Sequence, residues 1–146
     1  MWIDQRGSEV LGAAECRRLL ALAAKEVGYG RLAVSREGAP VVVPVNFTWQ
    51  DSEVRIRLAE GFLTSVVPGH LVAFEVDMVD EQAESAWSVL ARGLAHETDA
   101  AEGQGVGDGP QPMVPRPGDR VLAIRPDVVT GRRFPIRRAS RGPGPT

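Results

Sequence analysis

The 146-residue sequence lacks the features that mark secreted and membrane-spanning proteins. It has one cysteine, Cys16, which excludes an internal disulfide and favours a reducing compartment. Its start, MWIDQRGSEV, has no basic residues followed by an apolar run, and no segment approaches the roughly 20 apolar residues of a membrane span. We therefore expect a cytoplasmic protein without a membrane partner.

Histidines and phosphate-binding glycine motifs are also scarce. His70 and His96 are the only histidines, so we expect neither a metal site nor a Ser-His-Asp or Cys-His nucleophile. The segment EGQGVGDG, residues 102–109, has glycine at every second position, unlike the phosphate-binding pattern Gly-x-Gly-x-x-Gly. We predict a flexible loop for this segment.

The formal charge of −2 argues against a protein that binds nucleic acid over its whole surface. The charge is nevertheless uneven, because eight arginines lie beyond residue 115 and nine acidic residues lie between Glu75 and Asp108. Prolines and glycines near the end of the chain disfavour a folded surface there. We interpret residues 135–146 as a flexible basic tail that is solvated or contacts a second subunit. Nucleic-acid binding by this tail is the alternative.

Residues 1–134 predict a single domain, since 43% hydrophobic residues can fill one core. Apolar residues at helical spacing predict a helix over residues 12–27, which Gly28 ends. Barrel strands are expected from residue 31. The predicted strand-type runs are 31–35, 40–49, 53–59 and 70–77. Short turns between the first three runs predict antiparallel hairpins, and Pro44 predicts an edge or a bulge.

A fifth strand begins at about Trp87 and is expected to bend at Gly93, and a last strand is predicted over residues 120–134. A short helical crossing is expected between the third and fourth runs. About six antiparallel strands hide their edges best by closing. The sequence thus predicts a mainly β protein with one or two helices, arranged as a closed or split β-barrel.

Several segments in a fixed order resemble a known family. They are ECRRLLALA, GRLAVSREGAPVVVPVNF, LVAFEVD, WSVLARGLAHE and IRPDVVTGRRF. Together they resemble the pyridoxamine 5′-phosphate oxidase-like proteins, which have the FMN-binding split-barrel fold, over residues 11–134. The resemblance implies a homodimer with a cofactor groove between two barrels. The implied cofactor is usually FMN, and in some branches the deazaflavin F420 or haem.

The resemblance also implies a set of cofactor-binding residues. They are Val45, Asn46, Phe47, Arg57, Gly61, Thr64, Ser65, Trp87 and Ser88. The strand around Asn46 would run beside the flavin ring, and Arg57 would meet the phosphate bidentately. Other interpretations stay open: Phe47 as a core residue, Thr64 and Ser65 as helix caps, and Trp87 as a dimer anchor.

One segment departs from the family pattern. Family members commonly read Arg-Thr-x-x-Gly-Thr-Lys where this chain has apolar residues at Leu58, Phe62 and Leu63. Losing one cation and two hydroxyl donors weakens FMN binding in the usual pose, at about 1.5–3 kcal/mol per hydrogen bond to a charged group.

Two functions are therefore expected as alternatives. The first is an FMN- or F420-dependent oxidoreductase acting on a small organic substrate. The second is a cofactor-free homologue that binds a small molecule or a protein in an apolar former flavin groove. Genuine pyridoxamine phosphate oxidase activity is not expected, because the tail GRRFPIRRAS lacks the pattern typical of the substrate end.

Overall fold

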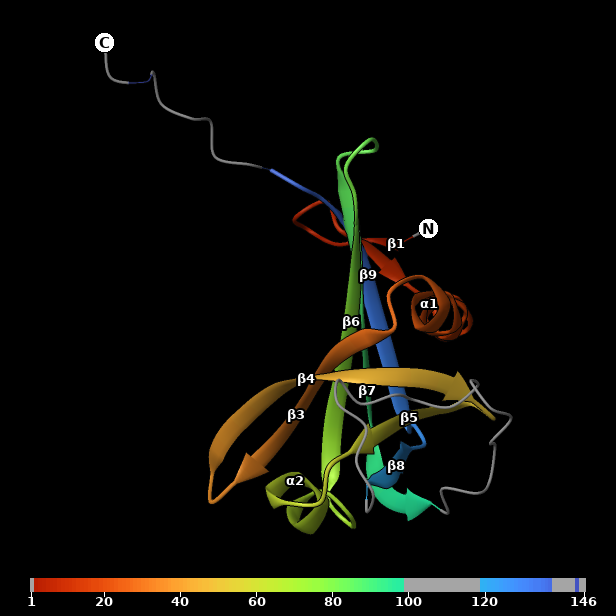
Figure 1. The fold of residues 1–146 in the computed structure, drawn as a ribbon. Helices are drawn as coiled ribbons and strands as arrows, with labels where there is room; N and C mark the ends of the chain where they lie inside the picture. The colour runs from red at the N-terminus through yellow and green to blue at the C-terminus, as the bar shows by residue number, and fades with distance from the viewer. Residues whose placement is uncertain (1, 99–118, 138–143, 145–146) are drawn as a thin grey trace.

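The computed structural model describes residues 2–98, 119–137 and 144. The predicted loop at 102–109 and most of the predicted basic tail lie outside these ranges. In chain order, the elements are β1 (Trp2–Ile3), β2 (Glu9–Leu11), α1 (Ala13–Glu26), β3 (Tyr29–Arg36), β4 (Ala39–Gln50), β5 (Glu53–Leu58), α2 (Phe62–Val66), β6 (Leu71–Asp80), β7 (Ser85–Thr98), β8 (Arg120–Ile124) and β9 (Val128–Pro135). Figure 1 shows their arrangement.

Six antiparallel strands close into a barrel in the order β3, β4, β5, β8, β7 and β6, with β6 paired back to β3. The barrel closes because two long strands, β4 and β7, each change barrel partner along their length. In β4, residues 39–46 pair with β3 and residues 47–50 pair with β5. In β7, residues 85–94 pair with β6 and residues 95–98 pair with β8. The predicted mainly β, split-barrel architecture is confirmed.

Helix α1 occupies the predicted position. Gly12 is its N-cap, and Gly28 beyond its end has φ +78°, a conformation that favours glycine. Its buried residues are Cys16, Leu19, Leu20 and Ala23. They recur at helical spacing, so one face of α1 packs against β4, β6, β7 and β9.

The prediction of one last strand over residues 120–134 is wrong. The segment forms β8 and β9, separated by residues 125–127. Pro126 has no backbone N–H to donate to a sheet, and the backbone N–H of Asp127 donates to the carbonyl of Arg92 (2.9 Å). The two halves also have different partners, because β8 pairs with β5 and β7 whereas β9 pairs with β7 and β2.

Pro44 lies on a sheet edge, as predicted. The backbone N–H of Phe47 donates to the carbonyl of Gly28 (3.0 Å) across the β3–β4 ladder. Backbone groups of an antiparallel strand alternate in direction, so those of Pro44 and Asn46 face away from β3. At residues 39–46, β4 is the last strand of its part of the sheet. A proline therefore removes no ladder hydrogen bond there.

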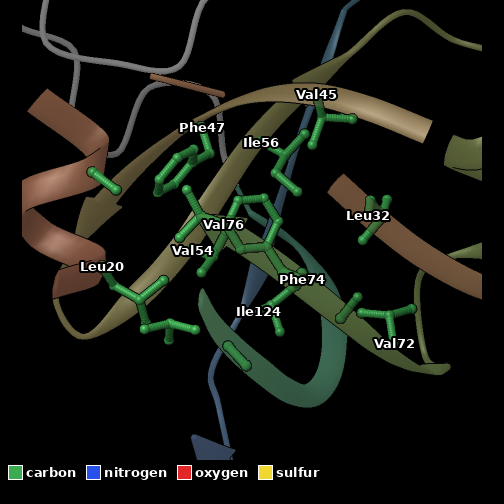
Figure 2. Packing of buried hydrophobic residues seen from close by; sticks show 14 of the residues in the cluster. Leu20, Leu32, Val45, Phe47, Val54, Ile56, Val72, Phe74, Val76 and Ile124 are labelled. Carbon is green, nitrogen blue, oxygen red and sulfur yellow. The ribbon is translucent and has the colours of Figure 1, made fainter. Parts of the chain in front are cut away.

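The barrel interior is filled by side chains from every wall (Figure 2). Phe47 of β4 and Phe74 of β6 point toward one another, with ring centroids 4.6 Å apart and planes inclined by 54°. Ile56 of β5 and Ile124 of β8 are also fully buried. The centre of this barrel is a packed core, so a ligand must bind on its outside or at its rim.

Several arginines that the sequence places in a basic C-terminal region are neutralised. Arg120 pairs with Glu97 (2.8 Å), and Arg132 pairs with Asp4 (2.8 Å). Arg133 pairs with Glu9 (3.2 Å). These ion pairs connect the C-terminal strands to the rest of the fold. Within the described ranges, no helix is long and apolar enough to cross a membrane.

Candidate functional site

Val45 and Phe47 contribute only backbone to any site outside the barrel. Their side chains are buried in the core, so the core interpretation of Phe47 is the one that the structure supports. Asn46 lies between them and points to the opposite face, because side chains alternate along a strand. Its backbone amide and carbonyl face away from β3. The edge of β4 at Asn46 is thus where this strand can meet a ligand.

Among the described residues, the guanidinium of Arg57 has no counter-charge. It lies near the end of β5 and is partly buried. Its Nε atom is buried without a hydrogen-bond partner, and no carboxylate of the described residues forms an ion pair with it. Burying a charge is costly unless it is paired. Arg57 is therefore suited to bind an anionic group of a ligand.

The neighbouring Arg55 is held differently. It is 8% exposed, donates to Gln50 Oε1 (3.0 Å) and to Asp51 Oδ2 (3.1 Å), and lies 3.6 Å from Glu53 Oε2. Glu53, also 8% exposed, lies 3.5 Å from Arg125 Nε. The Nε atom of Arg55 is also buried without a hydrogen-bond partner, so the difference between the two residues lies in their ion pairs: Arg55 belongs to a charge network, and Arg57 forms no ion pair with the described carboxylates. The alternation of EVRIRL put both arginines on one face, but only the tertiary structure separates their roles.

The turn after β5 offers fewer hydrogen-bond donors for a phosphate than the family resemblance implied. The Thr64 hydroxyl accepts the backbone N–H of Gly61 (2.8 Å) and donates to the carbonyl of Gly61 (2.9 Å). Thr64 is 3% exposed, so its hydroxyl caps α2 and has no proton left to offer a phosphate. Gly61 has extended backbone, and a Cβ there would meet no atom within 4 Å. Ser65 is exposed, and its backbone N–H is bonded to Gly61 (3.2 Å).

Leu58 and Leu63, which replace polar residues of the family pattern, are partly buried and pack against the core cluster. They therefore stabilise the end of the barrel, but they supply no hydrogen-bond donor to a phosphate. The predicted alternative function needs these residues to line an apolar groove. In the structure, Leu58 and Leu63 contribute part of their surface to core packing, and the side chain of Phe62, which that prediction also named, lies outside the described part of the chain.

Trp87 and Ser88 lie on opposite faces of β7. Trp87 is 9% exposed and belongs to the core cluster. The Ser88 hydroxyl donates to Glu75 Oε1 (3.0 Å) on β6, so its proton is already committed. Glu75 also accepts from Arg31 (3.1 Å), which bridges to Asp77 (3.0 Å). Ser88 thus belongs to a polar cluster on the outer face of the sheet.

Burial raises the pKa of the Glu75 carboxyl above its ordinary value, and the hydrogen bond with Asp77 raises it further. Ser88 and Arg31 act in the opposite direction, because they favour the ionised form. The carboxyl of Glu75 therefore ionises less readily in the folded protein than in the unfolded chain.

The implied site residues form two separate groups in one chain. Asn46 and Arg57 lie at β4 and β5, whereas Trp87 and Ser88 lie on β7, three strands from β4 across β3 and β6. Three strand spacings are about 14 Å. Ser88 also lines a surface hollow of about 450 Å³ between β2, β7 and β9. A chemical group that contacts Asn46 is therefore too far from Ser88 of the same chain to contact it as well.

Thr48 is a polar residue of this region that the sequence interpretation missed. It follows Phe47 on β4, and its hydroxyl oxygen is buried without a hydrogen-bond partner. The alternation of buried and outward residues along NFTW could have shown that Thr48 shares a face with Asn46. The described part of the chain holds no group of three or more His, Cys, Asp or Glu residues that could bind a metal.

Comparisons with known proteins show what the chain as a whole is similar to. The family model described as pyridoxamine 5′-phosphate oxidase matches residues 12–133. The uncharacterized protein Rv0080 of Mycobacterium tuberculosis is 34% identical over 129 residues, covering 82% of this chain and 81% of the relative.

Two solved structures have similar folds. The FAD-binding protein of Mycobacterium smegmatis is 31% identical with a TM-score of 0.66, over 87% of this chain and 98% of that one. An FAD-binding protein of Mesorhizobium loti has a TM-score of 0.66 over the same shares at 20% identity, which supports the fold alone.

Proposed function

Because the chain belongs to the pyridoxamine 5′-phosphate oxidase family, we propose that it is a homodimeric, flavin-dependent oxidoreductase acting on a small organic substrate. FMN and the deazaflavin F420 are the cofactors that the family resemblance implies. FAD joins them, because the similar protein of Mycobacterium smegmatis binds FAD.

Arg57 carries this proposal. Its Nε is buried without a partner and no described carboxylate neutralises it. All the proposed cofactors carry a phosphate group, which a guanidinium can meet with two parallel hydrogen bonds. The residues present thus fit the anionic end of a phosphorylated flavin at Arg57, although Leu58 and Leu63 add no donor.

The second subunit is proposed because one chain separates the two groups of site residues. The outer face of the β4–β3–β6–β7–β9 sheet carries a set of exposed apolar side chains. They are Tyr29 (51% exposed), Val42 (60%), Leu71 (64%), Val79 (54%), Leu94 (57%) and Val128 (42%). The strand registers direct all six to the same face. A second copy seated there would cover this apolar face and bring its own Ser88, which shares that face, toward Asn46 and Arg57.

A bound flavin would supply the hydride chemistry, and the protein would supply binding and orientation. Arg57 holds the anionic end outside the barrel. The β4 edge at Asn46 presents backbone groups to the polar rim of the ring, and the apolar face covered by the second subunit excludes water from it.

The test is the visible absorption of the purified protein, as isolated and after separate addition of FMN, FAD, F420 or haem with removal of the excess. We expect flavin or deazaflavin absorbance to be retained and to fall at least tenfold in occupancy with Arg57→Ala. The matched control is Arg18→Ala, which removes an exposed guanidinium paired with Glu15 on α1 (2.6 Å). A protein that retains none of the flavins would refute the proposal and favour the cofactor-free alternative.

Subunit association has its own test. We expect a mass in solution of twice the 15.7 kDa chain, and we expect Leu94→Asp, which places a charge on the apolar face, to yield monomers that no longer retain cofactor. A monomeric wild-type protein that binds flavin tightly would contradict the shared site.

A further inference from the structure

A charged cluster lies within the exposed apolar face of the β4–β3–β6–β7–β9 sheet. The Arg31 guanidinium on β3 donates to Glu75 Oε2 (3.1 Å) and to Asp77 Oδ2 (3.0 Å), both on β6. The three side chains are 47%, 26% and 41% exposed, so the cluster is accessible from outside. Leu71 and Val79 lie on the same face of β6, one on each side of the carboxylates, and both are exposed. A protein that covers this apolar face therefore covers the charged cluster as well.

The cluster is not neutral by itself. Two carboxylates share one guanidinium, and the Ser88 hydroxyl adds only an uncharged donor to Glu75 (3.0 Å). Removing the excess negative charge from water is costly unless a cation or further donors come with the partner. The surface that covers this face must therefore place a cationic group beside Glu75 and Asp77.

The strand register lets a second copy of this chain supply that cation. Arg31 lies directly opposite Glu75 on the neighbouring antiparallel strand. A two-fold axis that runs between β3 and β6, parallel to both strands and in the plane of the interface, turns position 31 onto position 75. We propose that two copies pack face to face about this axis, so that Arg31 of each subunit pairs with Glu75 of its partner. This inference rests on the homodimer of the proposed function, and it defines how that homodimer is assembled.

The same half-turn matches the next strands outward. Pro44 of β4 is level with Arg31, and Leu90 of β7 is level with Glu75, so Pro44 meets the partner's Leu90 in an apolar contact. Two residues further along these strands, Asn46 meets the partner's Ser88, and both side chains are polar. The axis therefore joins the two groups of site residues that one chain holds apart.

Charge disfavours another face-to-face arrangement. An axis that crosses the strands at the level of Arg31 would place Arg31 over the partner's Arg31 and Glu75 over the partner's Glu75. Like charges that face one another across an interface oppose association. Opposite charges on adjacent strands thus select the axis parallel to β3 and β6.

The experiment compares wild type with full-length Arg31→Glu and Glu75→Arg, each alone and as an equimolar mixture. In a dimer of either variant alone, facing positions carry the same sign, so we expect association roughly a hundredfold weaker than in wild type. In a mixed dimer, opposite charges face one another at both contacts, and association should recover. Like charges remain neighbours within each chain, so recovery in the mixture can come only from contacts between subunits. Sedimentation measures the association, and native mass spectrometry identifies the mixed dimer.

Two further variants support this comparison. Lys25→Glu is the matched charge reversal, because Lys25 is exposed on α1, and it should dimerise as wild type does. Arg31→Gln removes the charge without creating a repulsive pair, and circular dichroism shows which variants are folded. If the reversed variants do not fold, Arg31→Gln decides: we expect association about tenfold weaker, and unchanged or tighter association would overturn the inference.

The outcomes separate this inference from the proposed function. A monomeric wild type overturns both the homodimer and the Arg31–Glu75 contact, and it assigns the apolar face to a different partner. A dimeric wild type that retains no flavin refutes the oxidoreductase proposal, while the variants still decide the contact. If wild type is dimeric and binds flavin, but both reversed variants dimerise as tightly as wild type or their mixture gains nothing over either alone, the contact is wrong and flavin binding stands.

Discussion

Arg57→Met is the substitution that most directly tests whether Arg57 is kept for a ligand. Methionine keeps much of the apolar length of the side chain and removes the charge. A buried donor without a partner costs about 1–3 kcal/mol, and Arg57 Nε is such an atom. We expect the variant to raise the free energy of unfolding of the apoprotein by about 1–2 kcal/mol. At roughly 2–4 °C per kcal/mol for a chain of this size, the melting temperature should rise by about 2–8 °C.

The assay is thermal unfolding with and without saturating FMN or FAD, and Arg55→Met is the matched control. Arg55 donates hydrogen bonds to Gln50 and Asp51, and Arg55→Met also removes the positive charge 3.6 Å from the carboxylate of the nearly buried Glu53. The control should therefore lower the melting temperature, because a buried charge loses its partner. If Arg57→Met destabilises the apoprotein as Arg55→Met does, Arg57 stabilises the fold and the argument for an anion site is refuted.

Three further predictions concern the fold around the site. Gly93→Ala should destabilise the protein by about 1–3 kcal/mol in chemical denaturation, because a Cβ there would lie 2.3 Å from the carbonyl oxygen of Arg125; unchanged stability would contradict this packing. Thr64→Val should cost about 1 kcal/mol through the lost bonds to Gly61, whether or not flavin is present. The folded-state pKa of Glu75 is raised by burial, so the folded state holds its proton to higher pH and wild-type stability falls as pH rises through that pKa. The melting temperature of Glu75→Gln minus that of wild type should therefore increase between pH 4 and pH 8. A constant or falling difference would refute the raised pKa of Glu75.

Much of the architecture follows from local patterns. The helical spacing around Leu19 and Leu20 and the glycine at position 28 determine α1 and its end. Alternating residues separated by short turns determine the β3–β4 and β4–β5 hairpins, since neighbouring antiparallel strands need only a turn between them. Pro44 indicates an edge because it has no N–H to donate. These features depend on contacts between residues close in the sequence.

Other features depend on contacts between distant segments, and only the tertiary structure decides them. The last predicted strand divides at Pro126 because its two halves pair with different parts of the barrel. The hydroxyl of Ser88 is engaged by Glu75 because β6 and β7 lie in that register.

The same distinction holds for the site. The sequence alone indicated Arg57, through its place in an ordered set of family-like segments. The tertiary structure decided that Arg55 has several counter-charges while no described carboxylate pairs with Arg57, and that the hydroxyl of Thr64 is used within α2. It also decided that Leu58 and Leu63 pack on the core. The physical reason is that charge pairing and burial are set by the closure of the barrel, which brings together residues that no local pattern relates.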